Sequence, residues 1–546
     1  MNKNPFQKLL SMLSVDKRDI LYLYAYSIFY SLVSLSLPLG IQAIIGLIQA
    51  GTVSTNWIIL SAIVTIGVIA GGVLQVMQLS ITEIIQQRIF TRAAFEFTYR
   101  IPRFQSSSIR GMYPPEMINK FFDTLNIQKG LPKLLMDFSS SAIQIIIGLI
   151  LLSTYHPFFI TFGVALILLL TAILYYTGPR GLESSLQEST FKYKVAHWLQ
   201  EIARTMDTFK RAGHTELPLE KTDGLVQSYL SHRKKHWKTL IFQFSNIVAF
   251  KAFVTLGLLI IGGLLVIKNE INIGQFVASE IVIILIVNSA EKLILTMEPI
   301  YDVLTAVEKI SKVTDIPLEE DQGVIRFSEI DTGMGAAIDL KGVTYTSQDG
   351  KLDILKDLNI NIASGARVVI TGSNGSGKST LLRLLSAQYE ATSGTVSYNG
   401  QTAGNLNTAD LRYHIGDCFL SETLFEGTLL ENITLGRPEI DLSDVEWAVH
   451  GLGLKNFIMS LPMGYETPVG PTAIPLSSSL IERILLARAI ITRPRLLLVD
   501  DVFHLFDPKD RKSIIDFIWD EKQPWTLVAA SNLDVVCSHS TQTIKL

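Results

Sequence analysis

Six long apolar stretches fill most of the N-terminal half of this chain, and they constrain its fold more than any other feature. A helix needs about 20 mostly apolar residues to cross the hydrocarbon core of a bilayer. One such helix can lie in a soluble core, but six nearly uncharged stretches exclude that interpretation. The sequence therefore predicts six membrane-spanning helices, at Ile20–Ala50, Trp57–Ile81, Phe138–Tyr155, Phe158–Tyr176, Leu240–Ile267 and Ile273–Met297.

The connecting segments predict the orientation of these helices, because Lys and Arg gather on the cytoplasmic side of a membrane. Three connections, at Gly51–Asn56, Ser153–Pro157 and Lys268–Glu270, are short and carry little charge. The N-terminus and the two long connections are basic, with Lys3, Lys8, Lys17 and Arg18, then Arg88, Arg92, Arg100, Arg103, Arg110 and Lys120, then Arg204, Lys210, Arg211, Arg233, Lys234 and Lys235. We therefore expect a multi-pass protein of the cytoplasmic (inner or plasma) membrane whose N-terminus and C-terminal half are cytoplasmic.

The long connections are also expected to be helical. The segment Phe191–Lys210 places apolar residues, among them Trp198 and Ile202, at helical spacing. Such helices either carry movement to a cytoplasmic domain or are solvated extensions of the spans.

Four ionisable residues fall inside the predicted spans, where charges are costly and usually functional. They are Lys251 in the fifth span and Glu280, Glu291 and Lys292 in the sixth. Counted at about 1.5 Å per residue from the short connection between these spans, Lys251 and Glu291 lie at a similar depth. We expect them to form an ion pair; the alternative is that Glu291 and Lys292 are solvated at the membrane surface.

Length and charge complete this outline. A chain of 546 residues is long enough for two or three domains. The formal net charge of −3 gives no general attraction to nucleic acid, and the two cysteines have no metal-ligand spacing. We expect an all-α six-helix transmembrane domain with long cytoplasmic loops over residues 1–314, a linker over 315–336, and a P-loop α/β nucleotide-binding domain over 337–546.

A phosphate-binding motif carries the chemistry of the second domain. Gly372, Ser373, Asn374, Gly375, Ser376, Gly377, Lys378, Ser379 and Thr380 fit the pattern G-x-x-x-x-G-K-[ST], which requires a strand before it and a helix after it. A β-branched run, Arg367–Thr371, precedes the motif, and a helix-forming segment, Ser379–Leu385, ends it. Backbone N–H groups of such a loop surround phosphate oxygens, Lys378 would pair with the β- and γ-phosphates, and Ser379 would bind Mg²⁺. ATP and Mg²⁺ are therefore the expected cofactors.

From residue 337 onward the chain resembles the nucleotide-binding domain of ATP-binding cassette (ABC) exporters. The matching segments stand in family order: Leu340–Tyr345, the phosphate-binding loop, Leu476–Leu480 just before Ala487–Ala489, and Leu496–Asp500. The resemblance implies that Tyr345 stacks on adenine and that Asp500 holds Mg²⁺ through water. It also implies that Ser477, Ser478 and Ser479 belong to a signature segment that contacts ATP. Six spans match the usual exporter half, so the resemblance covers nearly the whole chain.

Four departures from the family pattern predict a degenerate hydrolytic site. Leu420 stands where the family has a glutamine that senses Mg²⁺ and the attacking water, and a leucine side chain forms no hydrogen bond. Asp501 replaces the catalytic glutamate, which makes it a weak general base because its arm is one methylene shorter. Asn532 replaces the histidine that contacts the γ-phosphate. The signature L-S-G-G-Q reads Leu476–Leu480 here, so serines replace both of its glycines.

In this family two cassettes meet head to tail, so each ATP lies between the phosphate-binding loop of one and the signature of the other. The resemblance therefore implies an obligate dimer in membrane lipid, either with a second copy or with another ABC half. It also implies weak ATP hydrolysis by this chain and an unidentified transported substrate. Two alternatives stay open: a non-transporting membrane regulator that senses nucleotide, and a component of a peptide or protein secretion exporter.

Overall fold

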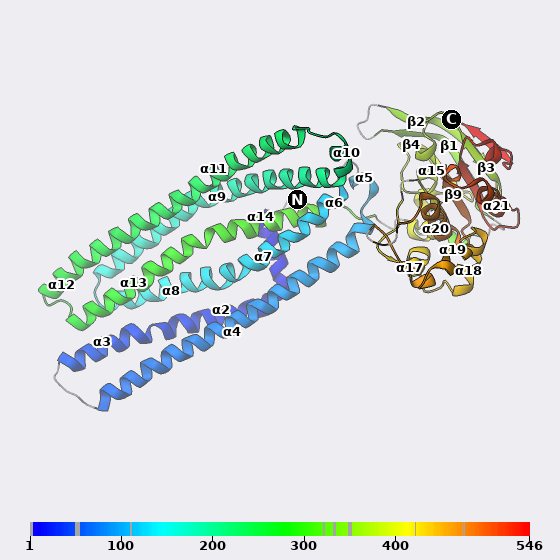
Figure 1. Ribbon diagram of the computed structural model, residues 1–546. Coiled ribbons are helices and arrows are strands. Elements are labelled where there is room, and N and C mark those ends of the chain that lie inside the picture. The colour runs from blue at the N-terminus through cyan, green and yellow to red at the C-terminus, as the bar shows by residue number, and fades with distance from the viewer. Residues whose placement is uncertain are drawn as a thin grey trace. The chain divides into compact units, whose positions relative to one another are not determined.

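We describe a computed structural model of the chain over residues 4–49, 55–109, 112–319, 323–330, 335–347, 352–420, 422–471, 473 and 475–546, without the side chains of residues 114 and 115. The chain forms two compact units, the first from Met1–Arg103 and Met112–Ile316, the second from Phe104–Gly111 and Pro317–Leu546 (Figure 1). Lys3, Ala50, Arg110 and the linker residues 320–322 and 331–334, on which some predictions fall, lie outside the described residues.

The first unit is all helical within its described residues. Its elements are α1 (Pro5–Leu13), η1 (Ser14–Asp16), α2 (Lys17–Ser34), α3 (Ser36–Gln49), α4 (Thr55–Arg100), η2 (Ile101–Arg103), α6 (Pro114–Asn119), η3 (Lys120–Phe122), α7 (Asp123–Pro132), η4 (Lys133–Phe138), α8 (Ser139–Ser153), α9 (Phe158–Arg204), α10 (Met206–Arg211), α11 (Leu217–Gly257), η5 (Leu258–Gly262), α12 (Gly263–Ile267), α13 (Ile273–Leu295) and α14 (Met297–Thr314). The turns η4 and η5 are π-helical.

These elements join into six helical rods that are long and apolar enough to cross a membrane, which confirms the six predicted spans. The rods are Pro5–Gln49, Thr55–Arg103, Glu116–Ser153, Phe158–Arg204, Leu217–Ile267 and Ile273–Thr314. Several rods extend well beyond the predicted spans: α4 has 46 residues, about 70 Å at the rise of an α-helix, against a hydrocarbon core of about 30 Å. The long connections are therefore helical, as expected.

Hydrogen bonds between small polar side chains link these rods inside the unit. The Gln78 Nε2 of α4 donates to Ser27 Oγ of α2 at 3.1 Å, and Ser140 Oγ of α8 lies 3.1 Å from the same atom. Gln243 of α11 donates to Thr177 Oγ1 of α9 at 2.9 Å. Such bonds and close packing of small residues hold helices together where the surroundings are as apolar as the side chains.

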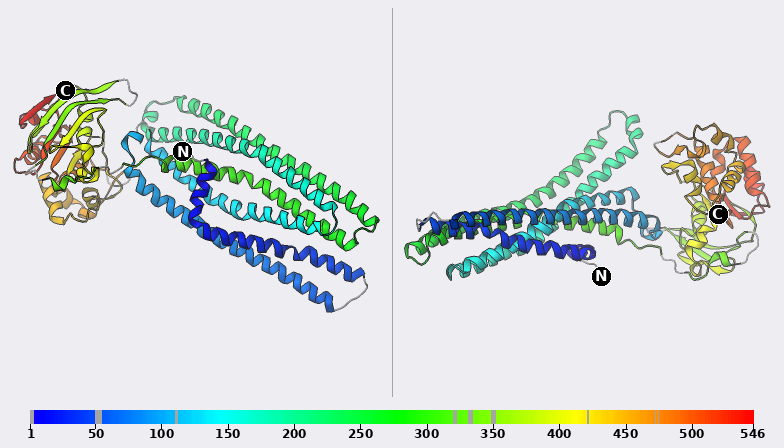
Figure 2. Two further views of the ribbon diagram at one scale, coloured as in Figure 1. Left: turned by 180° about the vertical axis from the view of Figure 1, so that it is seen from behind. Right: turned by 90° about the horizontal axis from the view of Figure 1, so that it is seen from below.

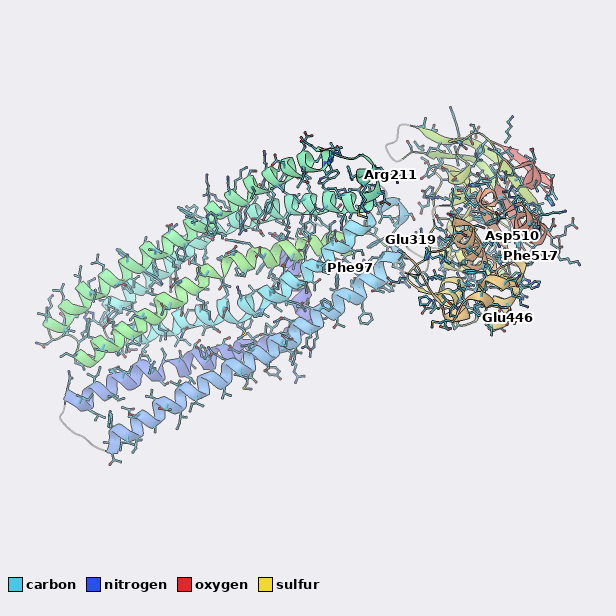
Figure 3. All side chains as sticks on the ribbon, in the orientation of Figure 1. Phe97, Arg211, Glu319, Glu446, Asp510 and Phe517 are labelled. Carbon is cyan, nitrogen blue, oxygen red and sulfur yellow. The ribbon has the colours of Figure 1, made fainter. Side chains whose placement is uncertain are left out.

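Two of the rods, α9 and α11, form an antiparallel hairpin that α10 closes. Its ends around α10 diverge from the other helices of the unit (Figure 2). Arg211 marks this closed end, whereas Phe97 lies near the end of α4 (Figure 3). Inside the hairpin, Trp198 Nε1 of α9 donates to Thr222 Oγ1 of α11 at 3.1 Å.

The second unit contains two main sheets. The antiparallel sheet has the order β2-β1-β4-β5, from β1 (Ile338–Thr346), β2 (Asp353–Ile362), β4 (Ser393–Tyr398) and β5 (Gln401–Thr402). The parallel sheet has the order β11-β3-β10-β9-β6, from β3 (Arg367–Thr371), β6 (Ile415–Cys418), β9 (Leu496–Asp500), β10 (Thr526–Ala530) and β11 (Gln542–Lys545). A short pair joins β7 (Gly427–Thr428) to β8 (Pro468–Val469).

The second unit also contains nine helices and four short turns among its described residues. They are α5 (Ser106–Ile109), α15 (Lys378–Leu385), α16 (Thr408–Tyr413), α17 (Leu429–Thr434), α18 (Leu442–Gly451), α19 (Lys455–Ser460), α20 (Ser478–Ile490), α21 (Pro508–Trp519) and α22 (Asp534–Cys537), with the short turns η6 (Phe327–Glu329), η7 (Ala403–Asn405), η8 (Gly464–Glu466) and η9 (Val502–Leu505). The turn η6 packs into this unit, because the Phe327 side chain is only 1% exposed. A six-helix transmembrane domain followed by a P-loop α/β domain is thus the fold, as predicted.

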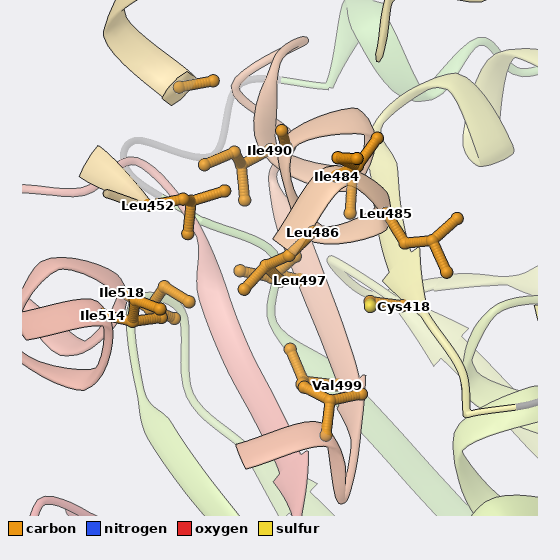
Figure 4. Close-up of a cluster of buried hydrophobic side chains, with 14 of the residues drawn as sticks. Cys418, Leu452, Ile484, Leu485, Leu486, Ile490, Leu497, Val499, Ile514 and Ile518 are labelled. Carbon is orange, nitrogen blue, oxygen red and sulfur yellow. The ribbon is translucent and has the colours of Figure 1, made fainter. Parts of the chain in front are cut away.

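The core of the second unit fixes the parallel strands. Leu497 and Val499 of β9 are fully buried and lie in one cluster with Leu486 and Ile490 of α20 and Ile514 of α21 (Figure 4). A strand that is buried on both faces has a continuous apolar sequence. Leu496–Asp500 is accordingly apolar at every position before Asp500. Parallel register aligns β3, β9 and β10, so their carboxyl ends meet at one edge of the sheet. That edge is where ligands bind in sheets of this kind.

Candidate nucleotide-binding site

The phosphate-binding loop begins where β3 ends at Thr371 and passes into α15 at Lys378. All three of its glycines have positive φ angles, Gly372 at +156°, Gly375 at +86° and Gly377 at +98°. A Cβ at Gly377 would lie 2.8 Å from Leu355 Cδ2, whereas a Cβ at Gly375 would meet nothing within 4 Å. The predicted strand, loop and helix are therefore present, and the loop has a shape that glycine permits.

The polar groups of this loop fit a phosphate chain. Lys378 Nζ donates to the carbonyl oxygens of Gly372 at 2.7 Å and of Ser373 at 3.0 Å, so its ammonium group lies inside the turn of the loop. The Ser376 hydroxyl is buried and has no hydrogen-bond partner among the described residues. A buried hydroxyl without a partner costs about 1–3 kcal/mol unless a ligand satisfies it. Phosphate oxygens above α15 would satisfy Ser376 and attract Lys378.

The residues expected to bind Mg²⁺ lie on two adjoining elements. Ser379 stands in the first turn of α15, and Asp500 is the last residue of β9. Thr380, expected to bind the nucleotide, follows Ser379 in the same turn. A hydroxyl and one carboxylate, together with phosphate oxygens and water, make the kind of oxygen shell that Mg²⁺ prefers. The chain itself would then supply few of the metal's oxygen ligands, and the nucleotide and water would supply the others. Ser373 and Asn374 form the exposed crest of the loop.

Asp501 follows Asp500 directly and has a left-handed backbone with φ +48°. Its backbone N–H donates to the Ala530 carbonyl at 2.9 Å, which ties it to the end of β10. Its carboxylate accepts a hydrogen bond from Ser531 Oγ at 3.4 Å. Burial raises the pKa of the Asp501 carboxyl, while the nearby His504 and the Ser531 hydroxyl lower it. The side chain is thus a short carboxylate held toward the sheet.

Sequence reasoning did not anticipate two residues that contact Asp501. His504 Nδ1 lies 3.9 Å from Asp501 Oδ1 and is hydrogen-bonded to the Asp501 backbone carbonyl. Ser531, the residue that follows β10, donates to the Asp501 carboxylate. The spacing of three residues between Asp501 and His504 is a signal that the sequence did offer. The sequence offered no such signal for Ser531, because the contact of Ser531 with Asp501 depends on the pairing of β9 with β10.

Asn532 is engaged with the phosphate-binding loop. Its Nδ2 donates to the Gly372 carbonyl at 2.9 Å, and its Oδ1 accepts from the Gly372 N–H at 3.2 Å. The Asn532 amide thus makes two hydrogen bonds to the backbone of Gly372, the first residue of the loop, and we call these two bonds the clamp. The structure therefore brings Asn532, Asp500, Asp501 and the loop to one edge of the sheet.

Leu420 lies in the segment after β6, where its side chain is 48% exposed. Beyond it, burial raises the pKa of the Glu422 carboxyl to about 7, and Asp417 adds to this rise. Arg488 opposes the rise. The position expected to sense Mg²⁺ and water therefore carries an exposed alkyl group, two residues before a carboxyl whose pKa burial raises to about 7.

Tyr345 is buried rather than presented at the surface. Only 4% of it is exposed, and its ring stacks on Tyr389 with centroids 5.3 Å apart and an interplanar angle of 3°. One face of the ring is thus occupied by another aromatic residue, and the stacking of adenine on Tyr345 stays a prediction.

The signature segment forms the start of a regular helix. Ser477 caps α20, because its Oγ accepts a hydrogen bond from the Leu480 N–H at 3.3 Å. Ser478 is the first residue of that helix, and Ser479 Oγ accepts from Arg483 Nη2 at 3.4 Å. The described residues show no hydrogen bond between these serines and the phosphate-binding loop. A helix N-terminus suits an anion, and the contact of Ser477, Ser478 and Ser479 with ATP stays a prediction.

Comparisons with known proteins agree with this picture. Residues 20–289 match the family model described as "ABC transporter transmembrane region", and residues 355–504 match the model described as "ABC transporter". The chain is 35% identical over 184 residues to the ABC-type transporter kk1G of Curvularia clavata, which covers 34% of this chain and 14% of that protein. It is 34% identical over 218 residues to a putative multidrug export ATP-binding/permease protein of Staphylococcus aureus (strain NCTC 8325 / PS 47), which covers 38% of each.

A solved structure extends the comparison to the whole fold. A bacterial Atm1-family ABC exporter with ATP bound superposes with a TM-score of 0.84, covering 98% of this chain and 94% of that chain at 19% identity. At this identity the likeness shows the fold. The sequence alignments with the curated relatives span well under half of those proteins.

Proposed function

Because this chain belongs to the ABC transporter family, as an exporter half with one transmembrane region and one ATP-binding domain, we propose that it binds ATP at a site whose own hydrolytic parts are impaired. On this proposal it works as a dimer that moves a substrate across the cytoplasmic membrane. Nucleotide binding closes the two cassettes, the helical extensions carry that movement, and the spans open toward the other side. The N-terminus and the ATP-binding domain are cytoplasmic.

One observation carries the proposal: the phosphate-binding loop keeps its glycines, its lysine and its hydroxyls, whereas the hydrolytic positions are altered. The loop places Lys378 and the unsatisfied Ser376 hydroxyl where phosphates would bind. At the hydrolytic positions stand a short carboxylate at Asp501, an uncharged amide at Asn532 and an exposed alkyl group at Leu420. An amide can donate a hydrogen bond to phosphate but carries no positive charge, and a leucine does neither.

The clamp between Asn532 and Gly372 supports the same interpretation. The amide makes one bond as donor and one as acceptor to the Gly372 backbone. Nδ2 carries two N–H groups, so one is engaged by the Gly372 carbonyl and the other is left to donate to a phosphate oxygen. The amide therefore stabilises the shape of the binding loop and offers a phosphate at most one hydrogen bond, without positive charge.

A heterodimer fits these features best. In a homodimer every altered residue would stand in both sites, and both sites would hydrolyse slowly. With a second ABC half whose catalytic residues are intact, one of the two composite sites would use that half's own phosphate-binding loop and carboxylate. This chain would contribute Ser477–Ser479 to that site and hold ATP at the other. The relatives named above include a putative multidrug exporter, which is consistent with an export function.

The test is ATPase activity of the purified chain, alone and together with the ABC half that co-purifies with it from membranes. The proposal expects slow turnover alone and faster turnover with the second half, lost when that half's catalytic carboxylate is removed. Robust turnover by this chain alone that Asp501→Ala abolishes would contradict the degenerate site. Nucleotide-driven flux in reconstituted vesicles separates transport from the alternative of a nucleotide-sensing regulator, which would bind ATP without flux.

A further inference from the structure

The aromatic residue that was expected to stack on adenine lies inside the core of the second unit. Tyr345 belongs to a cluster of buried side chains that also contains Leu355 of β2 and Leu382 of α15. One face of its ring is covered by Tyr389, whose ring is almost parallel to it. Because only 4% of Tyr345 is exposed, a base can reach neither face of the ring without displacing buried side chains.

The alternation of β1 shows where a ring would leave the core. Side chains of a strand point to opposite faces in turn. Along β1, Val343 and Tyr345 are buried, whereas Thr344 and Thr346 are partly exposed. The next side chain on the buried face is therefore that of Ser347, which directly follows the strand and is half-buried. A serine thus stands at the position from which an aromatic ring could be presented at the edge of the core.

This end of β1 and the strand paired with it border the phosphate-binding loop. Thr346 pairs with Asp353 in the antiparallel hairpin of β1 and β2. A Cβ placed on Gly377 would lie 2.8 Å from Leu355 Cδ2 and 3.2 Å from the Ile354 carbonyl oxygen, so the start of β2 touches the residue that precedes α15. The hairpin that the family resemblance assigns to the base therefore adjoins the loop that would hold the phosphates.

The sequence of the hairpin end and the loop contains no other ring for a base. From Thr346 to Thr380 no residue is Phe, Tyr, Trp or His. Bases also stack on guanidinium planes, but the one arginine of this range, Arg367, is 3% exposed and donates to the backbone carbonyls of Trp525 and Asp520. This part of the chain therefore offers a base no flat group on which to stack.

Hydrogen bonds are the other means of distinguishing bases, and they discriminate strongly where the wrong base leaves a buried polar group unpaired. The polar side chains that the structure describes at the hairpin end bond within the hairpin instead. Thr346 Oγ1 donates to Asp353 Oδ1 at 2.9 Å, and Ser347 Oγ accepts from the Leu352 N–H at 3.1 Å. Asp353 and Leu352 are exposed, so water can satisfy these groups whichever base is present.

We propose that this site recognises the triphosphate and not the base, so that it takes ATP, GTP, CTP and UTP alike. The inference rests on the proposed binding of nucleotide at the phosphate-binding loop. Lys378, the Ser376 hydroxyl and the backbone N–H groups of the loop bind phosphate oxygens, and all four nucleotides carry the same triphosphate. A site that holds its nucleotide rather than cleaving it is then filled by whichever triphosphate the cytoplasm supplies.

Equilibrium competition on the purified full-length chain with Mg²⁺ tests this proposal. Radiolabelled ATP is bound first, and unlabelled ATP, GTP, CTP, UTP, inorganic tripolyphosphate or adenosine competes with it. We expect the four nucleotides to compete at concentrations within about threefold of one another, because they share every group that the site binds. Tripolyphosphate, which has no base, should compete as well, whereas adenosine, which has no phosphate, should not.

Adding a ring at the hairpin end should create the missing contact. Ser347→Tyr should raise the affinity for ATP relative to tripolyphosphate by about fivefold or more, which is the lower end of what stacking of one base contributes. Binding of tripolyphosphate by the same variant shows that the loop is intact. Ser443→Tyr is the matched control, because Ser443 is exposed on α18, outside the hairpin and the loop. That variant should bind every competitor like the wild type.

Three results would overturn the inference. An advantage of ATP over CTP and UTP of about tenfold or more would show that the site reads the base, and its loss in Tyr345→Leu would assign that contact to Tyr345. Competition by adenosine would show that the base supplies affinity. An unchanged ratio in Ser347→Tyr would contradict the placement of the base at the hairpin end. If radiolabelled ATP does not bind the wild type at all, the proposed nucleotide binding itself is refuted, and this inference falls with it.

Discussion

Lengthening the carboxylate at position 501 should raise ATP hydrolysis by this chain. Asp501 stands at the end of β9 with its carboxylate near Ser531 and His504. The substitution Asp501→Glu keeps the charge and adds one methylene, which moves the carboxylate outward by about 1.3 Å in an extended side chain. The family places a glutamate here to polarise the attacking water, so the added reach addresses the defect directly.

The size of the effect follows from geometry. Misplacing a catalytic group by about 1 Å can cost on the order of 100-fold in rate. Leu420 and Asn532 would still be altered in the variant, so we expect a gain of about 10- to 100-fold rather than full activity. The left-handed backbone of residue 501 suits Asp better than Glu. The variant should therefore lose up to about 1 kcal/mol of stability even as it gains turnover.

Phosphate release by the purified chain at saturating ATP measures this prediction. Asp534→Glu is the matched control, because Asp534 is an exposed aspartate a few residues beyond the site, and its variant should keep the wild-type rate. Affinity for a fluorescent ATP analogue should be unchanged in both variants. A rate for Asp501→Glu at or below that of the wild type, with ATP affinity intact, would refute the argument from arm length.

Three further predictions follow from particular contacts. Gly377→Ala should weaken binding of the ATP analogue more than Gly375→Ala, because both backbones are left-handed but only a Cβ at Gly377 meets a side chain at 2.8 Å. Above pH 7, Glu422→Gln should be more stable than the wild type by on the order of 1–2 kcal/mol, after allowance for solvent screening, and should melt at a higher temperature. This difference in stability should vanish near pH 4.5. The reason is that burial raises the pKa of the Glu422 carboxyl to about 7, so the wild type loses stability as pH rises through that value. Reversing the charge of Lys251 or of Glu291 alone should lower the free energy of unfolding by about 1 kcal/mol and with it the melting temperature. Reversing both charges should restore most of that loss. An additive loss in the double variant would exclude the pair.

Hydropathy was enough to predict the six spans, because backbone groups in lipid must be satisfied within each segment and helices do this locally. The full lengths of the helices were harder to predict. Beyond Ile81, α4 continues to Arg100 with mixed polar and apolar residues. Packing against other helices, and not apolarity, stabilises that part. The structure confirms the Lys251–Glu291 ion pair, which was predictable from depth alone. The Lys292–Asp137 pair was missed because Asp137 fell just outside the predicted third span.

The candidate site also has parts that the sequence predicts and parts that it does not. The phosphate-binding loop is a local motif, so its strand, turn and helix could be predicted from consecutive residues. The clamp of Asn532 on Gly372 joins residues 160 positions apart. It exists only because β10 lies beside β3 in the parallel sheet. The burial of Tyr345 against Tyr389 also depends on distant packing, and the pattern of its strand did not indicate which side of the sheet is covered.

If this chain binds ATP and cleaves it slowly, the nucleotide that it retains should stay uncleaved. Radiolabelled ATP is bound to the purified chain with Mg²⁺, free nucleotide is removed, and the bound nucleotide is identified after several minutes. We predict that it is recovered mainly as ATP and that Lys378→Ala abolishes its retention. Recovery mainly as ADP, with the cleavage lost in Asp501→Ala, would show that the chain's own site is hydrolytically competent.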